Sequence, residues 1–192
     1  VIDPAPVPEG PDAVISGELS GSVTEDVSVD VNGDLVASGQ LAITDDDAGE
    51  AFFNAATVPG AHGSLTITPD GAWTYEVDND LPAVQSLGAG ATLTDTVTVS
   101  SVDGTVQSIA ITITGTNDAA FITGAVTGSV TEDVLVDANG DRVASGQLAI
   151  TDADAGEAFF RAETVSGTHG SLTITSDGAW TYEVDNDLPE VQ

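Results

Sequence analysis

Residues 62–78 read HGSLTITPDGAWTYEVD, and this stretch decides the fold class of the chain. Apolar side chains alternate with polar ones on both sides of a turn sequence: Leu65 and Ile67 precede Thr68–Gly71, and Trp73 begins the alternation that follows it. A period of two is typical of a half-buried β-strand. Pro-Asp-Gly between two such runs predicts a tight turn. We therefore expect an antiparallel hairpin with the tryptophan in the core.

Nearly the same stretch occurs twice in the chain. Residues 21–85 recur as residues 128–192, and only 10 of the 65 positions differ. Two nearly identical modules at a fixed spacing suit reach, stiffness or multivalent binding better than a single active site. The first copy continues beyond Gln85, whereas the second copy stops at Gln192, the residue that corresponds to Gln85. Either the parent protein continues the array or the sequence is a trimmed piece. If neither holds, the exposed sheet edge must be covered, and a strand from another copy could cover it.

Alternating runs and turn signals predict an all-β fold. The predicted strands lie near residues 14–19, 34–44, 51–57, 62–68, 72–78, 91–100 and 105–114. Seven short strands in about 100 residues are typical of a Greek-key β-sandwich. We therefore expect tandem seven-stranded sandwiches, the second incomplete. The expected boundaries are 1–12 for a Pro-rich leader or linker, 13–118 for the first repeat, and 119–192 for a second repeat that lacks its last two strands.

The charge balance excludes several classes of function. The 192 residues carry 32 acidic and 2 basic side chains, a formal net charge of −30, and no cysteine. Such a chain cannot neutralise nucleic-acid phosphates or bind anionic lipid, so we expect no nucleic-acid partner. It has no apolar run of 18 residues, so we expect no membrane insertion. An acidic disordered chain is the alternative, but the alternating apolar runs favour a folded protein.

The acidic residues gather in the loops at strand ends, in both repeats. The loop DVNGD places Asp30, Asn32 and Asp34 at alternate positions, and its counterpart is Asp137, Asn139 and Asp141. A further loop carries Asp45 and Asp47. Ca²⁺ takes six to eight oxygen ligands, and neighbouring carboxylates without basic partners call for a divalent cation. The alternative is that the acids only keep the surface soluble. His62 and His169 are single strand-edge residues, which argues against zinc.

The motifs together closely resemble the VCBS repeat of large bacterial surface and secreted proteins. The resemblance rests on GSVTED, ASGQLAITDxDAGE, HGSLTIT, DGAWTYEVDND, LPAVQSLGAGATLTDTVTVSSVDGT and GTNDAA, and covers nearly the whole chain. It implies a tandem extender module of type I-secreted RTX adhesins, which act in cell adhesion and biofilm formation. It further implies an extracellular location at the bacterial surface. The implied partners are neighbouring repeats of the same chain.

A weaker resemblance to cadherin repeats implies where calcium would bind. Cadherins hold Ca²⁺ where consecutive sandwiches meet, and the matching positions here are Glu25, Asp78, Asp80, Asn117, Asp118, Asp152 and Asp154. The resemblance thus implies an ion near residue 118 that stiffens the chain, with millimolar-range affinity as in extracellular modules. Three positions depart from the cadherin pattern: Asn79, Ala119 and Ala120.

Two other functions compete with the extender. A glycan- or receptor-binding module would use exposed aromatic residues, and the candidates for such a contact surface are Phe52, Phe53, Phe159 and Phe160. Its partners would be a cell-surface glycan or, through strand donation, other copies in a fibre. An enzyme is not expected. The sequence has no Lys or Cys and no distinctive Ser-His-Asp pattern, and the paired carboxylates are better explained as calcium ligands.

Overall fold

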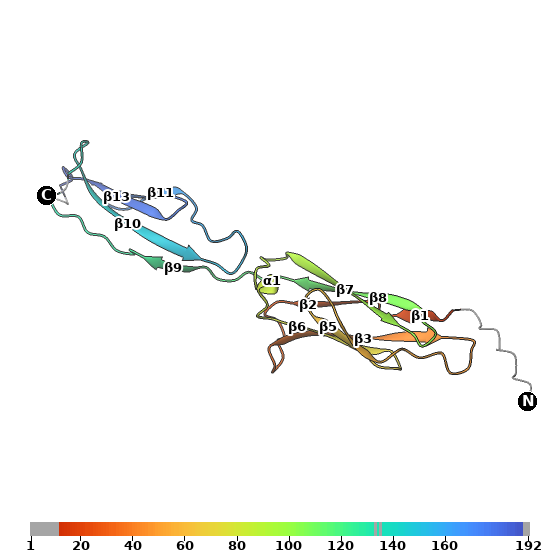
Figure 1. Cartoon of the computed structure of the whole chain (residues 1–192). Coiled ribbons are helices and arrows are strands. Elements are labelled where there is room, and N and C mark those ends of the chain that lie inside the picture. Colours follow the sequence, from red (N-terminus) through yellow and green to blue (C-terminus); the bar gives the residue numbers. More distant parts are fainter. Residues whose placement is uncertain (1–11, 133, 135, 190–192) are drawn as a thin grey trace, which may run out of the picture. The chain divides into compact units, whose positions relative to one another are not determined.

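The computed structural model of the chain describes residues 12–132, 134 and 136–189 (Figure 1). The chain divides into two compact units, residues 1–117 (unit 1) and 118–192 (unit 2). The predicted leader falls almost entirely on residues 1–11, which lie outside the described residues. Within the described part of the chain, no helix is long and apolar enough to span a membrane.

Unit 1 consists of a five-stranded and a three-stranded sheet. The strand order of the first is β1-β3-β6-β5-β4, and that of the second is β2-β8-β7. One four-residue helix, α1 (Pro82–Gln85), follows β6. The strands are β1 (Val14–Gly17), β2 (Ser20–Thr24), β3 (Asp34–Thr44), β4 (Ala56–Pro59), β5 (Ser64–Ile67), β6 (Ala72–Asp78), β7 (Thr92–Ser100) and β8 (Val106–Thr114).

The predicted hairpin joins β5 and β6. Its turn is closed by two backbone hydrogen bonds, from Thr68 N to Ala72 O at 2.9 Å and from Gly71 N to Thr68 O at 3.0 Å. The Thr68 hydroxyl adds a bond to the Asp70 carboxylate at 2.5 Å. Gly71 has φ +87°, the left-handed conformation that glycine adopts without steric cost. The turn fixes the register in which Leu65 faces Tyr75.

The two sheets enclose one hydrophobic core, so the all-β sandwich is confirmed. The period-two positions of β5 and β6 are buried, and Trp73 is 2% exposed. The facing side chains come from alternate positions of β7 and β8, and each is 3% exposed or less: Val97, Val99, Ile109, Ile111 and Ile113. Burial of branched apolar side chains on this scale is the main favourable term in folding, at about 25 cal/mol per Å² of apolar surface.

The strand expected at 14–19 is in fact two strands in different sheets. β1 pairs antiparallel with β3, whereas β2 pairs parallel with β8. Gly17, with φ +111°, ends β1, and a Cβ there would lie 2.5 Å from Gln40 O. Only glycine fits this close approach, which redirects the chain to the other sheet. The strand expected at 51–57 is reduced to a single bridge at Phe53, and β4 begins at Ala56.

Unit 2 repeats the five-stranded sheet, in the order β11-β12-β13-β10-β9 (Figure 1). Its registers match those of unit 1: Trp180 faces Gly146 as Trp73 faces Gly39. The strands are β9 (Phe121–Gly124), β10 (Asp141–Thr151), β11 (Glu163–Ser166), β12 (Ser171–Ile174) and β13 (Ala179–Asp185).

The described part of unit 2 has no counterpart of the three-stranded sheet. Residues 127–131 correspond to β2 in sequence but form no strand. In unit 1, β2 is an edge strand whose only strand partner is β8. Since the described residues of unit 2 include no equivalent of β8, residues 127–131 have no strand with which to pair.

Candidate metal centre

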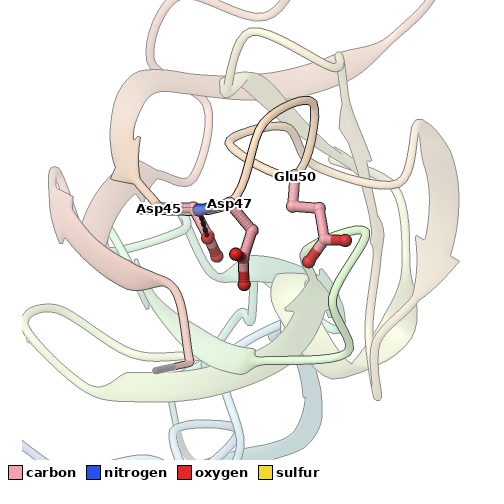
Figure 2. Close-up of side chains that lie close together, drawn as sticks. All are labelled: Asp45, Asp47 and Glu50. Atoms are coloured by element: carbon pink, nitrogen blue, oxygen red, sulfur yellow. Dashed lines mark hydrogen bonds between the residues drawn. The ribbon is translucent and has the colours of Figure 1, made fainter. Parts of the chain in front are cut away.

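Three acidic side chains gather in the loop that follows β3. Asp45, Asp47 and Glu50 each offer a carboxylate oxygen, and these oxygens lie within 4.8 Å of one another. Figure 2 shows all three carboxylates turned to the same side of the loop. Asp45 and Asp47 were expected from the sequence, whereas Glu50 was not. The signal that could have found it is its position three residues after Asp47, across the bend at Gly49 (φ +93°).

The loop backbone holds the cluster in place. The Asp47 amide donates to Asp45 Oδ1 at 2.7 Å, which forms an Asx turn (Figure 2). The other oxygen, Asp45 Oδ2, is buried and has no hydrogen-bond partner among the described residues. A buried carboxylate oxygen without a donor costs free energy unless a cation or water satisfies it.

The charge around the cluster fits a cation. Both basic residues of the chain, Arg142 and Arg161, belong to unit 2, so unit 1 has neither lysine nor arginine. Carboxylates this close repel one another, and a bound divalent cation would compensate their charge. Oxygen-only ligands suit Ca²⁺, which accepts six to eight of them. The three residues therefore fit part of a calcium coordination sphere.

In unit 2 the same loop is hydrogen-bonded to Asp118, a residue near which the cadherin resemblance implies an ion. The Asp154 amide donates to Asp152 Oδ1 at 2.9 Å, as in the first repeat. Asp154 is 2% exposed, and its Oδ2 accepts from the Asp118 amide at 2.9 Å. Its Oδ1 is buried without a hydrogen-bond partner among the described residues. These two bonds link the backbones of Asp118 and Asp154 to neighbouring carboxylates, but the three carboxylates do not form a group within 4.8 Å among the described residues.

Glu25 is anchored to the end of β8. It is fully buried, its amide donates to Thr114 O at 2.9 Å, and its Oε2 accepts from the Thr116 amide at 3.0 Å. Asp78 and Asp80 are exposed, and the Asp80 amide donates to Asp78 Oδ1 at 2.9 Å. Glu25, Asp78 and Asp80 do not form a group of three within 4.8 Å; among the described residues only the cluster after β3 does.

Asn79, which departs from the cadherin pattern in the middle of VDND, has a structural role that local sequence patterns do not predict. It is 6% exposed and exchanges two hydrogen bonds with Asp26: the Asp26 amide donates to Asn79 Oδ1 at 2.9 Å, and Asn79 Nδ2 donates to Asp26 Oδ1 at 2.8 Å. These bonds hold Asp26 at φ 57°, an unusual conformation for a residue other than glycine. Asn79 therefore shapes the loop that carries Glu25.

The DVNGD loops use their first aspartate to close a turn. Asp30 Oδ1 accepts from the amides of Asp34 at 2.9 Å and Asn32 at 2.8 Å. These bonds to the Asp34 and Asn32 amides lower the pKa of Asp30 below its usual 3.8. Asp137 makes the same turn with Asp141 and Asn139, and its pKa is lowered in the same way.

The two phenylalanine pairs differ in exposure. Phe53 is 2% exposed and packs in the core of unit 1, whereas Phe52 is 49% exposed. In unit 2, Phe159 is 61% exposed and Phe160 is half-buried. The solvent-facing members of the candidate contact surface are therefore Phe52 and Phe159.

Comparison with known families identifies the fold. Residues 11–115, more than half of the chain, match the sequence profile described as the bacterial cadherin-like domain. The chain belongs to the bacterial cadherin-like domain family. The match covers the sandwich of unit 1 almost from end to end, and the internal repeat extends the cadherin-like sequence into unit 2. The chain matches none of the curated proteins in sequence.

Several solved structures resemble this cadherin-like chain. The protocadherin gammaB7 EC3–6 structure gives a TM-score of 0.49 at 16% identity and covers 90% of the chain. A 1.5-MDa bacterial ice-binding adhesin gives 0.34 at 15% identity over 93%. A Ca²⁺-stabilised, ice-binding adhesin of an Antarctic bacterium gives 0.25 at 18% over 91%. The chain spans only 39%, 55% and 40% of the length of these three solved chains, respectively.

Proposed function

We propose that the chain is a non-catalytic extender module of a bacterial surface adhesin or extracellular fibre, stabilised and stiffened by Ca²⁺. One observation carries the calcium part: Asp45, Asp47 and Glu50 converge within 4.8 Å in a unit that has no basic side chain except His62. The family membership and the tandem repeat support the structural part. A series of like sandwiches increases reach, as repeat proteins do.

The proposed mechanism is electrostatic. The formal net charge of the chain is −30, and the repulsion among its acidic side chains opposes the compact state. A bound Ca²⁺ replaces the repulsion between neighbouring carboxylates with attraction and satisfies the buried Asp45 Oδ2. Because the unfolded chain does not hold the cluster together, calcium binding adds directly to the free energy of unfolding.

The proposal includes a second cation site, as the cadherin resemblance implies. Its expected ligands within unit 2 are Asp118, Asp152 and Asp154, where the Asp118 and Asp154 amides donate to the carboxylates of Asp154 and Asp152. Its expected ligands within unit 1 are Glu25, Asp78, Asp80 and Asn117. Calcium held by these residues is expected to stiffen the chain.

We further propose that the parent protein is an extracellular adhesin of the VCBS type. Weak calcium sites, with dissociation constants of about 10⁻⁴–10⁻³ M, fill in extracellular fluids and stay empty at cytosolic calcium levels. A chain kept open by its charge inside the cell could pass a secretion channel and fold outside. Type I secretion and a role in biofilms are parts of this proposal.

Thermal unfolding with and without Ca²⁺ tests the proposal. With calcium at about ten times its dissociation constant, each site adds about 1.4 kcal/mol to the free energy of unfolding. We expect a rise in the melting temperature that Mg²⁺ at the same concentration does not reproduce, because magnesium requires a smaller octahedral site. Small-angle scattering should show a narrower range of particle lengths with calcium. Equal melting curves in calcium and in chelator would leave the acids as a solubilising coat and refute the calcium role.

A further inference from the structure

Unit 2 exposes an apolar hollow on one face of its sheet. The cavity measures about 430 Å³ and is lined by strand residues of β10, β12 and β13 together with residues 125–130. Its apolar lining includes Leu148, Leu172, Ile174, Trp180 and Tyr182. Among the described residues of unit 2, no second sheet covers this face.

Unit 1 shows what covers the same surface when it is complete. Leu65, Ile67 and Tyr75 lie at the equivalent positions of strands with identical sequences, and they are 0%, 2% and 0% exposed. Leu172 and Tyr182 are only half-buried. Since the residues and the strand registers are the same, the difference in burial comes from the covering hairpin, β7 and β8.

The hairpin of unit 1 is held by one polar anchor besides its apolar face. Asp95, on β7, is 1% exposed. Its carboxylate accepts from the backbone amides of Ala61, His62 and Gly63, at 2.8, 3.0 and 3.1 Å, and from the Tyr75 hydroxyl at 2.8 Å. Hydrogen bonds to a charged group are each worth more than neutral ones. The loop and the tyrosine therefore recognise a carboxylate at this position of the hairpin.

Unit 2 has the counterparts of the loop and the tyrosine that bind the Asp95 carboxylate in unit 1, at residues 167–170 and Tyr182. The loop at Gly167 is closed by a bond from its amide to Gly170 O at 2.7 Å, as Gly60 bonds to Gly63 at 2.8 Å. A Cβ added at Gly60 would lie 2.3 Å from Asp95 Oδ2. At Gly167, the nearest atom to such a Cβ is Gly170 O at 3.3 Å. The volume that the carboxylate fills in unit 1 is thus open in unit 2.

We propose that the apolar face of unit 2 is a docking site for a two-stranded β-hairpin with the pattern of Thr92–Thr114. Its first strand supplies an Asp to the loop around His169 and to the Tyr182 hydroxyl. Its second strand places alternating β-branched residues over Leu172 and Trp180. Residues 127–131 then pair with this second strand, as β2 pairs with β8. This docking requires no calcium and does not rest on the proposed function.

A peptide of residues 86–115 added to the whole 192-residue chain tests the docking. The readout is hydrogen exchange of the amides of residues 127–131, which gain sheet partners only when the hairpin docks. We expect their exchange to slow by at least about tenfold, as expected for newly paired strand amides. The same segment appended after Gln192, the counterpart of Gln85, gives an intramolecular version of the measurement in case the free peptide aggregates.

Two matched variants test the polar anchor. Replacing the aspartate of the added segment (Asp95→Asn in the peptide) keeps its shape and removes the charge, so binding should weaken at least about tenfold. Gly167→Ala in the chain puts a methyl group where the carboxylate must sit, so it should abolish docking. The exchange of β12 and β13 amides shows whether this variant retains its sheet.

The exchange measurements distinguish a docked hairpin from a second copy of the chain on the apolar face of unit 2. Protection of residues 127–131 by the peptide and by the appended segment, lost in Gly167→Ala, supports the proposal. No protection in either version overturns it. A dimer that already protects these residues without peptide, and that the peptide does not displace, would show that a second copy covers the face and would also overturn it.

Discussion

The Tyr75 hydroxyl donates a 2.8 Å hydrogen bond to Asp95 Oδ2, and this bond joins the two sheets of unit 1. Tyr75 lies on β6 of the five-stranded sheet, and Asp95 lies on β7 of the three-stranded sheet. Both residues are almost completely buried, at 0% and 1% exposed. A buried carboxylate is stable only where its hydrogen bonds are satisfied, so this pair favours the observed alignment of the two sheets.

Asp95→Asn should lower the free energy of unfolding of the chain by about 2 kcal/mol. The asparagine side chain has nearly the same volume, but its NH₂ group cannot accept the amide hydrogen bonds of the loop, and the charge that strengthens them is lost. Denaturant unfolding in calcium-free buffer measures the loss. Tyr75→Phe is the companion variant, since it removes one of the four donors. It should cost less than Asp95→Asn, and a larger cost would show that the backbone amides contribute little.

The same carboxylate predicts a pH dependence. Burial by itself would raise the pKa of Asp95, but the hydrogen bonds from the Ala61, His62 and Gly63 amides and from Tyr75 outweigh it and lower the pKa to about 2, against 3.8 for an ordinary aspartate. Because the folded-state pKa lies below the unfolded one, the stabilisation is fully present above pH 3.8. It is lost as the pH falls through about 2.

The difference in stability between the wild-type chain and Asp95→Asn isolates this contribution from that of the other acids. We expect the difference to stay constant from neutral pH down to about pH 4 and to shrink toward pH 2. Denaturant unfolding at a series of pH values measures it. A difference that persists unchanged at pH 2 would mean that the variant acts by distorting the packing, not through the charge.

Gly60→Ala and Gly167→Ala should differ in cost although they alter the same loop of the two repeats. At Gly60 the new methyl group would lie 2.3 Å from Asp95 Oδ2, so either the loop or the hairpin must shift. We expect a loss of about 1–3 kcal/mol, as for overpacking of a core. At Gly167 only the Gly170 carbonyl is near, at 3.3 Å. Chemical denaturation of both variants measures the two costs, and equal costs would contradict the role assigned to the carboxylate.

Most of the fold could be predicted from the sequence because the period-two runs are long. β3, β6, β7 and β8 lie within two residues of their predicted bounds. The period-two runs gave wrong strand bounds where the backbone conformation, and not the alternation of apolar residues, decides where a strand ends. Gly17 divides the first predicted strand between two sheets, and its role depends on the approach of Gln40 O, which is distant in sequence. Likewise, the loss of the β2 pairing in unit 2 follows from its missing partner, although residues 127–131 keep nearly the same sequence as β2.

The candidate site was predictable only in part, because loop conformation decides which acids converge. Asp45 and Asp47 were expected from their spacing, but Glu50 joins them through a bend that no alternation encodes. Asp95 was overlooked because an acidic residue within a strand run gives no loop signal, and its partners lie more than 30 residues away in sequence at Ala61–Gly63. Tertiary contacts of this kind cannot be inferred from local patterns.

Asp45→Asn should reduce the calcium-induced stabilisation of the chain. The asparagine retains the oxygen that closes the turn with Asp47 but removes the charge of the oxygen that is buried without a donor. We expect its calcium dissociation constant at this site to rise at least about tenfold, since ligand charge sets the affinity of such sites. Calorimetric titration measures the change.

Asp46→Asn is the matched control for the calcium site. Asp46 lies in the same loop, is exposed and is outside the cluster, and the second repeat has Ala153 at this position. It should leave calcium binding almost unchanged, apart from a small general charge effect. Equal weakening by both variants would indicate that calcium responds to the overall charge of the loop and not to a built site.

Leu65→Ala and Leu172→Ala compare the same side chain in two settings. In unit 1 a second sheet covers it, and in unit 2 it lines the apolar hollow. Leu65 is 0% exposed between the two sheets, so its truncation leaves a cavity and should cost about 2–5 kcal/mol. Leu172 is half-buried beside the hollow of unit 2, where solvent already reaches it, so its truncation should cost about half as much or less. Hydrogen exchange of β5 and β12 measures each loss within its own unit.

If the hairpin of residues 86–115 docks on unit 2, the cost of Leu172→Ala should rise toward that of Leu65→Ala in its presence. If the two costs are already equal without the hairpin, the face of unit 2 is covered by something else.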